Sequence, residues 1–180
     1  MSGVRVTLLR GTAASPWELR AWEGVGEPYD VEVLIPRANL YDTSLVALRK
    51  RPVRTVGGLL PAPAARLVGE RYLGLRRALA GTDVVHSAEI SPWFAVQPAR
   101  LKRRLGFRLV LTVWETLPFV DAYRNVRTRA YRREVLAAAD LLLPTTSRAA
   151  DALALEGVDA ARVELCPPGV DVDRFAPARE

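Results

Sequence analysis

The segment Val163-Glu-Leu-Cys-Pro-Pro-Gly-Val-Asp-Val-Asp-Arg-Phe175 lies near the end of the 180-residue chain and contains the predicted end of its sheet. The apolar run over residues 163–166 predicts a last strand. The two prolines that follow carry no backbone N–H, so neither can extend a ladder of hydrogen bonds, and Gly169 permits a sharp turn. The sequence therefore predicts a strand that stops in a corner and passes the chain onward.

Strand-like and helix-like segments alternate along the rest of the chain. Apolar and β-branched runs predict strands, and apolar side chains at helical spacing predict helices. The predicted strands cover residues 4–9, 30–35, 83–86, 107–113 and 141–143, and the predicted helices cover 67–79, 91–105, 121–139 and 148–155, with a further helix starting at Ser15. Residues 37–63 are predicted to be a variable connection that contains a short strand at 53–56. This alternation predicts a Rossmann-like, three-layer α/β/α domain with a mainly parallel sheet of six or seven strands.

Three serines are predicted to start helices. In Ser15-Pro-Trp-Glu18 the serine hydroxyl can accept a hydrogen bond from the third helical amide, and the glutamate can reach back to the serine amide. Ser91-Pro-Trp93 repeats the first three residues of this pattern, and Ser147 is predicted to cap the last helix.

Size and charge limit the classes of protein. A chain of 180 residues with 49% apolar side chains suits one domain. Its formal charge of +6 comes almost entirely from arginine, since Lys50 and Lys102 are the only lysines. Arginine binds carboxylates and phosphates well, so this balance favours anionic ligands without identifying one.

Cysteine and histidine are too scarce for several kinds of site. The single cysteine, Cys166, excludes an internal disulfide, and the single histidine, His86, argues against a metal site built from these two residue types. The longest apolar stretch, residues 135–143, contains Asp140 and is far shorter than the roughly 20 residues that span a bilayer. With no recognisable signal peptide, we expect a soluble, cytoplasmic protein.

Small and polar residues follow the predicted strands. Ligands of open parallel sheets bind beyond the carboxyl ends of the strands, near the point where strand order reverses. The candidates at these positions are Gly11, Thr12, His86, Glu89, Trp114, Glu115, Thr116, Thr146 and Ser147. They are expected to gather along one edge of the sheet.

Each candidate also has a structural interpretation. His86 is equally consistent with a hydrogen-bonded structural imidazole, and Glu89 with a carboxylate that caps a helix or pairs with an arginine. Glu115 is the stronger functional candidate, because a carboxylate at the mouth of a buried strand is costly unless it is solvated or paired. Trp114, like Trp17 and Trp93, is more typical of core packing than of sugar binding.

Four segments together carry a resemblance to a known family. They are Asp83-Val-Val-His-Ser-Ala-Glu89, Leu111-Thr-Val-Trp-Glu-Thr-Leu-Pro118, Ala139-Asp-Leu-Leu-Leu-Pro-Thr-Thr-Ser147 and Cys166-Pro-Pro-Gly-Val-Asp-Val-Asp-Arg-Phe-Ala-Pro177. In order and spacing they resemble the N-terminal half of glycosyltransferase family 4 enzymes of GT-B architecture. The resemblance implies that residues 1–170 form the acceptor-side domain, that 171–180 begin the interdomain linker, and that a second Rossmann-like domain is missing.

The resemblance also implies a reaction. Such enzymes move a sugar from a nucleotide-sugar donor to a hydroxyl acceptor and retain the anomeric configuration. They need no metal or other cofactor, and the donor nucleotide lies mainly on the second domain. Glu115 and His86 are then the acceptor-side catalytic candidates, and the other strand-end residues are candidates for substrate binding. Because half a site cannot exclude water or orient two reactants, the chain alone is predicted to be inactive or nearly so.

Two positions depart from the family pattern. Many members carry a glycine pair in the first loop, where backbone amides approach the donor diphosphate, whereas Gly11 stands alone here. Many members place a histidine after the fifth strand, where this chain has Trp114 and Glu115. Asp171-Val-Asp173 resembles the metal-binding motif of the other major glycosyltransferase fold, but its place in the linker segment argues against that role.

Two groups of basic residues leave other partners open. They are Arg100, Lys102, Arg103, Arg104 and Arg108, and then Arg124, Arg127, Arg129, Arg132 and Arg133. Such runs are usually solvated helix faces, although docking on an anionic membrane is a sharper hypothesis. The alternative function is a non-catalytic module that binds nucleic acid or a phosphorylated polymer, with nucleic acid the less expected partner. A dinucleotide-binding or P-loop protein is disfavoured because neither glycine-rich motif is present.

Overall fold

The computed structural model describes residues 3–61, 64, 70–119 and 125–169. Its strands are β1 (Val4–Leu9), β2 (Tyr29–Pro36), β3 (Arg49–Thr55), β4 (Tyr72–Leu73), β5 (Val84–Ala88), β6 (Arg108–Val113) and β7 (Leu141–Pro144). Its helices are α1 (Pro16–Arg20), α3 (Leu75–Ala78), α4 (Trp93–Leu105), α5 (Val126–Ala138) and α6 (Ser147–Leu155), with a 3-10 turn η1 at Ala160–Arg162. None of these helices is long and apolar enough to cross a membrane.

Within the described residues the strands form one seven-stranded sheet in the order β4-β3-β2-β1-β5-β6-β7. Neighbouring strands are parallel except for the antiparallel β3–β4 pair. The prediction of a mainly parallel, Rossmann-like sheet is therefore confirmed. The chain first builds outward from β1 through β4, then returns to the other side of β1 and builds outward from β5 to β7. The strand order thus reverses between β1 and β5.

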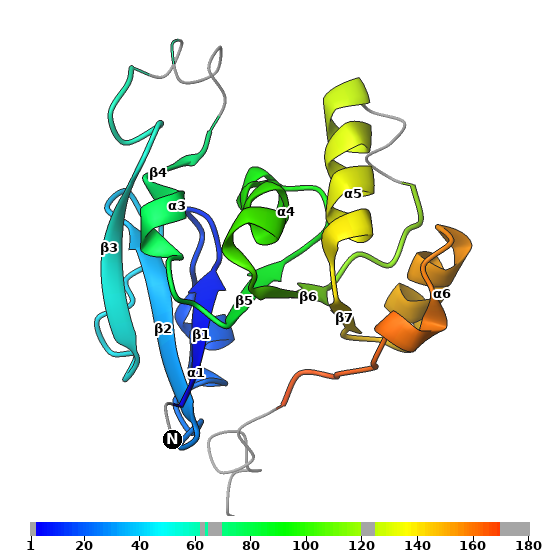
Figure 1. The fold of residues 1–180 in the computed structure, drawn as a ribbon, viewed down its shortest axis with the longest axis horizontal. Helices are drawn as coiled ribbons and strands as arrows, with labels where there is room; N and C mark the ends of the chain where they lie inside the picture. Colours follow the sequence, from blue (N-terminus) through cyan, green and yellow to red (C-terminus); the bar gives the residue numbers. More distant parts are fainter. Residues whose placement is uncertain (1–2, 62–63, 65–69, 120–124, 170–180) are drawn as a thin grey trace, which may run out of the picture.

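One face of the sheet is covered by α3, α4 and α5, which Figure 1 shows side by side. The core beneath them joins residues of these helices, among them Leu79 and Val135, to strand residues such as Val85 and Leu111. All four side chains have no exposed surface. Burying a side chain of this size stabilises the fold by about 1.5–3 kcal/mol.

The other face is covered less completely. Leu19 of α1 packs there with Val6, Leu8 and Val33, over the β1–β2 part of the sheet. Successive residues of a strand point to opposite faces, so His86 lies on the face opposite Val85. His86 and its neighbours on β6 and β7 line a cavity on this side rather than a packed core.

The predicted helix over 67–79 is wrong at Tyr72 and Leu73, which form β4, and is confirmed only over Leu75–Ala78. Tyr72 and Leu73 pair antiparallel with Thr55 and Arg54, and α3 begins only at Leu75. The side chain of Gln97 accepts a hydrogen bond from the Tyr72 amide at 2.7 Å and donates one to the Tyr72 carbonyl at 3.1 Å. This tertiary contact holds residue 72 extended despite the helical spacing of the sequence. Residues 65–69 lie outside the described part.

The region predicted as a variable connection contains a full strand. β3 covers Arg49–Thr55, whereas the sequence suggested only residues 53–56. Glu32 on β2 pairs with Arg51 at 2.7 Å and with Arg49 at 3.6 Å, so the positive charges of β3 are partly neutralised by its neighbour.

The predicted last strand is reduced to a single bridge between Leu142 and Val163. The amides of Glu164 and Cys166 donate to the carbonyls of Leu142 and Pro144 at 3.0 and 2.9 Å, so the segment still follows β7. Residues 170–180, which contain the Asp-Val-Asp motif and the predicted linker, lie outside the described part.

Helix starts differ in detail from the predictions. The Ser15 hydroxyl donates to the Glu18 carboxylate at 3.2 Å and caps no helical amide. Pro92 rather than Ser91 precedes α4, and Thr146 rather than Ser147 caps α6 by accepting from the Ala149 amide at 3.1 Å. The helix predicted from residue 121 begins at Val126, after the cap Asn125, and residues 121–124 are not described.

Candidate functional site

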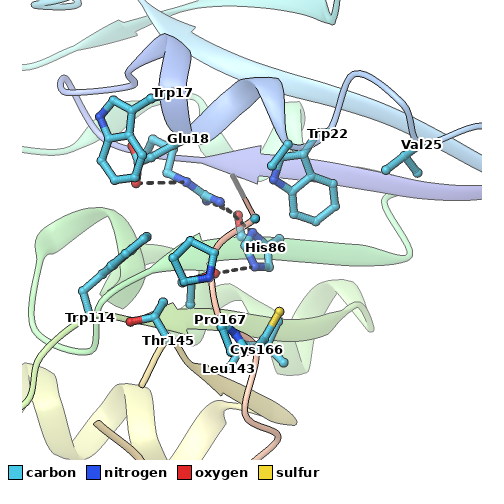
Figure 2. A pocket seen from close by; sticks show the side chains of 15 residues that line it. Trp17, Glu18, Trp22, Val25, His86, Trp114, Leu143, Thr145, Cys166 and Pro167 are labelled. Carbon is cyan, nitrogen blue, oxygen red and sulfur yellow. Dashed lines mark hydrogen bonds and ion pairs between the residues drawn. The ribbon is translucent and has the colours of Figure 1, made fainter. Parts of the chain in front are cut away.

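A cavity of about 370 Å³ lies against β5–β7, on the face that α1 covers only in part. Its lining includes Arg10, directly after β1, and His86 in the middle of β5, and the strand order reverses between these two strands. Ligands of open α/β sheets usually bind near such a point. In Figure 2 the residues of the α1 region form one wall, and β5–β7 with the segment 166–169 form the other. The lining residues are Arg10, Trp17, Glu18, Ala21, Trp22, Val25, His86, Thr112, Trp114, Leu143, Thr145, Cys166, Pro167, Pro168 and Gly169.

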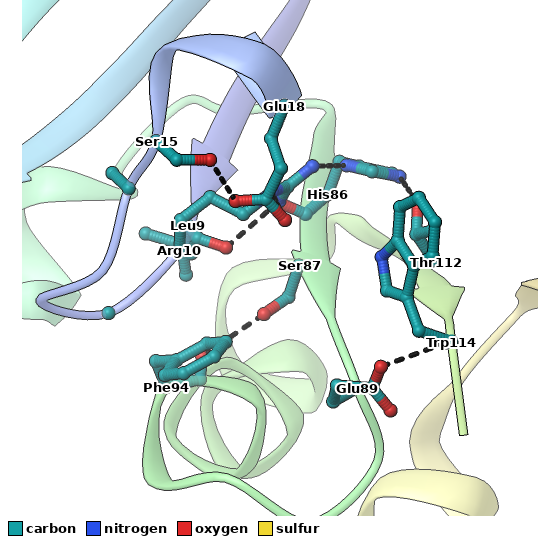
Figure 3. Close-up of polar contacts among 12 residues, drawn as sticks. Leu9, Arg10, Ser15, Glu18, His86, Ser87, Glu89, Phe94, Thr112 and Trp114 are labelled. Carbon is teal, nitrogen blue, oxygen red and sulfur yellow. Dashed lines mark hydrogen bonds and ion pairs between the residues drawn. The ribbon is translucent and has the colours of Figure 1, made fainter. Parts of the chain in front are cut away.

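A buried polar chain runs from Arg10 through His86 to Thr112 (Figure 3). The Arg10 guanidinium donates to the carbonyls of Leu9 and His86 at 3.0 and 3.1 Å and to His86 Nδ1 at 2.8 Å. Because arginine has no acceptor, Nδ1 must accept, and Nε2 carries the proton that faces Thr112 Oγ1 at 3.1 Å. Burial, assisted by the charge of Arg10, holds the pKa of His86 well below its ordinary value. His86 is therefore a neutral imidazole.

Glu18 supplies the opposite charge for Arg10. Its Oε1 lies 3.9 Å from Arg10 Nε, and both side chains are largely buried. Burial lowers the pKa of Arg10, while Glu18 raises it. An arginine nevertheless stays protonated in proteins, so this corner of the cavity holds a charged pair with no net charge.

Glu89 fixes the start of the loop that follows β6. It adopts a left-handed backbone conformation with φ of 59°, and its carboxylate accepts from the Trp114 amide at 2.9 Å. Burial raises the pKa of Glu89 and nearby Glu115 raises it further, whereas its backbone hydrogen bonds and Arg132 lower it. The Glu89 side chain thus fixes the backbone of Trp114.

The described part of the same loop is also held at Phe119, by Glu156 at the C-terminal end of α6. The Phe119 amide donates to Glu156 Oε1 at 3.0 Å, and Glu156 forms a buried ion pair with Arg132 of α5. Between Trp114 and Phe119 the Glu115 carboxylate accepts from the Leu117 amide at 2.9 Å. Glu115 is only partly buried, so it remains accessible beside Trp114, which makes an edge-on contact with Trp17 at 5.4 Å between ring centroids.

The loop that follows β1 has little free space around the backbone of Gly11. Gly11 has φ of 63°, and a Cβ placed there would lie 2.4 Å from the ring of Phe94. Its amide donates to the Tyr72 hydroxyl at 2.8 Å, and the Thr12 carbonyl accepts from Leu40 at 2.8 Å. Both loop groups are thus engaged within the protein.

The structure brings some predicted residues together and leaves others apart. His86 and Trp114 line the cavity, and Glu89 and Glu115 hold or flank the Trp114 loop. Thr116 is exposed, and the Thr146 hydroxyl is used as a helix cap. Ser147 is exposed as the first residue of α6, whereas Thr145, two residues earlier, reaches the cavity.

Arg10, Glu18, Trp22 and Thr112 are cavity residues that the sequence analysis did not select. Thr112 could have been found, because it stands two residues before Trp114 and so shares its side of the strand. Arg10 directly follows an apolar strand, which in a sequence is indistinguishable from a solvated strand end. Among the described residues, no group of three or more His, Cys, Asp or Glu side chains could hold a metal ion.

Comparisons with solved structures show the fold. UDP-GlcNAc 2-epimerase from Methanocaldococcus jannaschii matches with a TM-score of 0.58 and 14% identity over 90% of this chain and 45% of its own. The enzyme from Neisseria meningitidis bound to UDP-GlcNAc matches with a TM-score of 0.60 and 12% identity over 90% and 45%. Anabaena Alr3699/HepE in complex with UDP matches with a TM-score of 0.62 and 13% identity over 96% and 46%. This chain therefore has the fold of one Rossmann-like half of GT-B and spans less than half the length of these proteins.

Comparisons of sequence decide the family. No curated protein matches the chain. The model of Glycosyltransferase Family 4, however, matches residues 3–174, which is almost the whole sequence and includes all the strand-end candidates. The chain belongs to glycosyltransferase family 4.

Proposed function

We propose that this chain is the acceptor-side half of a retaining glycosyltransferase, and that a second Rossmann-like domain completes the enzyme. One observation carries the proposal. The cavity at the point where strand order reverses has residues 166–169 in its wall. In the proposed enzyme the second domain follows this wall segment in sequence and closes a cleft over the cavity.

The donor in this proposal is a nucleotide sugar. The Neisseria and Anabaena structures contain UDP-GlcNAc and UDP, and both are about twice as long as this chain. The amide of Gly11 and the carbonyl of Thr12 are already hydrogen-bonded within the protein, which fits a donor held mainly by the other half. We expect no metal or cofactor requirement.

In the proposed reaction the bond between the sugar C1 and the diphosphate oxygen breaks, and a bond from C1 to the acceptor oxygen forms with retained configuration. The acceptor hydroxyl loses its proton to a base, for which Glu115 is the candidate because its carboxylate is accessible. His86 has both ring nitrogens engaged and would act by holding Thr112 and the cavity wall. Glu89 would position Trp114.

The proposal is tested by assaying two proteins side by side with a panel of radiolabelled nucleotide sugars and hydroxyl acceptors. One is the 180-residue chain, and the other is the chain extended through the reading frame that follows residue 180. We expect transfer only by the extended protein, with the donor's anomeric configuration in the product by NMR. Robust transfer by the shorter chain, or inversion by the longer one, would refute it.

The ion pairs argue against the alternative of a non-catalytic anion-binding module. Arg100 pairs with Glu134 at 2.6 Å, and Lys102 and Arg108 pair with Asp140 at 2.7 and 3.1 Å. Cations that are already paired bind a further anion less strongly. An anion binder should lose affinity after charge reversal at exposed Arg103 and Arg104 but be indifferent to Glu115→Ala.

A further inference from the structure

The charged groups in the cavity wall interact with one another. Arg10 is 5% exposed, three of its hydrogen bonds go to Leu9 and His86, and Glu18 balances its charge. Arg10 Nε has no hydrogen-bond partner, but the Glu18 carboxylate faces it at 3.9 Å. A ligand would therefore meet a neutral pair rather than a free cation.

The uncharged polar groups are also largely engaged. His86 uses Nδ1 toward Arg10 and Nε2 toward Thr112, and the Thr145 hydroxyl donates to the Val113 carbonyl at 3.4 Å. The described wall groups that keep hydrogen-bonding capacity for a ligand are the Glu18 carboxylate, the Thr112 hydroxyl hydrogen and the indole N–H groups.

Apolar surface makes up the rest of the wall. Trp17, Trp22 and Trp114 present indole rings, and Val25, Leu143, Pro167 and Pro168 add aliphatic carbon. Figure 2 shows Trp17, Trp22 and Val25 across the cavity from Leu143 and Pro167. A cavity of about 370 Å³ with such walls has the size and chemistry of a site for a small organic group.

We infer that the acceptor is an amphiphilic alcohol, whose uncharged aromatic or short hydrocarbon portion occupies this cavity; the inference rests on the proposed function. A free sugar would give up hydrogen bonds to water and regain few from this wall, which costs free energy. An apolar group would lose only its unfavourable contact with water. The cavity thus selects against sugars and charged acceptors.

Binding to the 180-residue chain tests the inference without any donor. The probes are 2-naphthol and octan-1-ol, compared with glucose, with tryptophan fluorescence and calorimetry as readouts. We expect at least one of the two alcohols to bind at least tenfold more tightly than glucose. Leu143→Glu should weaken that binding at least tenfold, because it places a charge in the wall. Leu155→Glu on α6, where Leu155 is 68% exposed and outside the cavity, should leave it unchanged.

A second variant guards against misfolding of the first. Val25 lines the cavity but is 38% exposed, so Val25→Asp should fold normally and also weaken binding. Glucose binding as tight as that of both alcohols, or alcohol binding insensitive to both cavity variants, would overturn the inference. Binding to the 180-residue chain but not to the extended protein would also overturn it, since the second domain would then fill the cavity.

Failure of the inference can be told apart from failure of the proposed function. If the cavity binds the alcohols but the extended protein transfers no sugar, the proposed function is refuted and only the cavity's apolar selectivity stands. If the extended protein glycosylates free glucose as fast as either alcohol, and Leu143→Glu does not slow it, the inference is wrong and the function stands.

Discussion

Gly11 has no room for a side chain. Its positive φ disfavours any residue with a Cβ, and a methyl group would overlap the Phe94 ring. We predict that Gly11→Ala lowers the free energy of unfolding by at least about 2 kcal/mol, from backbone strain and overpacking together. Urea denaturation measures this. Gly24→Ala is the control, since a methyl there has no heavy atom within 4 Å, and equal losses in the two variants would contradict the account.

His86 should make stability depend on pH. Its folded pKa is depressed, while the unfolded chain keeps a value of about 6.5. Between these values the unfolded state binds more protons, so stability falls as the pH drops from 7 to 5, by up to about 1.4 kcal/mol per pH unit. Thermal unfolding across this range tests the prediction.

The matched variant for that experiment is His86→Gln, which should flatten the pH dependence. Glu89 acts in the opposite direction, because its raised pKa makes the folded state the better proton binder as the pH falls. The comparison is therefore best made in a Glu89→Gln background. If stability still falls with pH to the same extent after His86→Gln, another group causes the pH dependence.

For single residues, the sequence predicts where a side chain lies better than it predicts what the side chain does. The ends of parallel strands lie along one edge, so His86 and Trp114 could be placed near a common site. The partner of His86 could not be found, because the contact with Arg10 joins residues 76 positions apart through the packing of β1 against β5. Burial and, with it, this contact keep His86 neutral.

Helix α5 is joined to the C-terminal end of α6 by the ion pair of Arg132 and Glu156, whose side chains are each 4% exposed. Removing one partner leaves a buried charge without compensation. We predict that Arg132→Met destabilises the fold by about 3–5 kcal/mol. Arg133→Met on the exposed side of α5 should change stability by no more than about 0.5 kcal/mol. Denaturant midpoints compare the two, and a loss below about 1 kcal/mol for Arg132→Met would contradict the account.

Helices and strands that are determined by residues adjacent in sequence could be predicted. β6 is a run of apolar and β-branched residues, and a glycine with φ of 80° ends the preceding helix at Gly106. β4 could not be predicted, because the side chain of Gln97 and the partner strand hold Tyr72 extended. β3 was largely missed because a segment rich in arginine is typical of a loop in the sequence. Its arginines are accommodated in a strand by ion pairs with Glu32 of β2, which only the structure shows.

At the scale of the whole molecule, docking on an anionic membrane stays a prediction, and the exposed basic residues of α4 are the candidates for it. Arg103 and Arg104 are exposed. If they face anionic lipid, each contributes about 1 kcal/mol, so Arg103→Gln with Arg104→Gln should weaken co-sedimentation with phosphatidylglycerol vesicles about tenfold or more at low salt. The control is Arg37→Gln with Arg54→Gln, which removes the same number of positive charges from another part of the surface. Equal effects of the two pairs, or no co-sedimentation at all, would contradict membrane docking.

In the proposed enzyme, the edge around Trp114 and Glu115 forms the acceptor side of a cleft that a second domain completes. Its most direct test is the acceptor kcat/KM of the extended protein after Glu115→Gln and Trp114→Ala, with Asp151→Asn on the exposed surface of α6 as control. We predict that each of the first two changes lowers kcat/KM about 10²-fold or more, with the control unaffected. Rates within twofold of the unmodified protein for both changes would contradict the account.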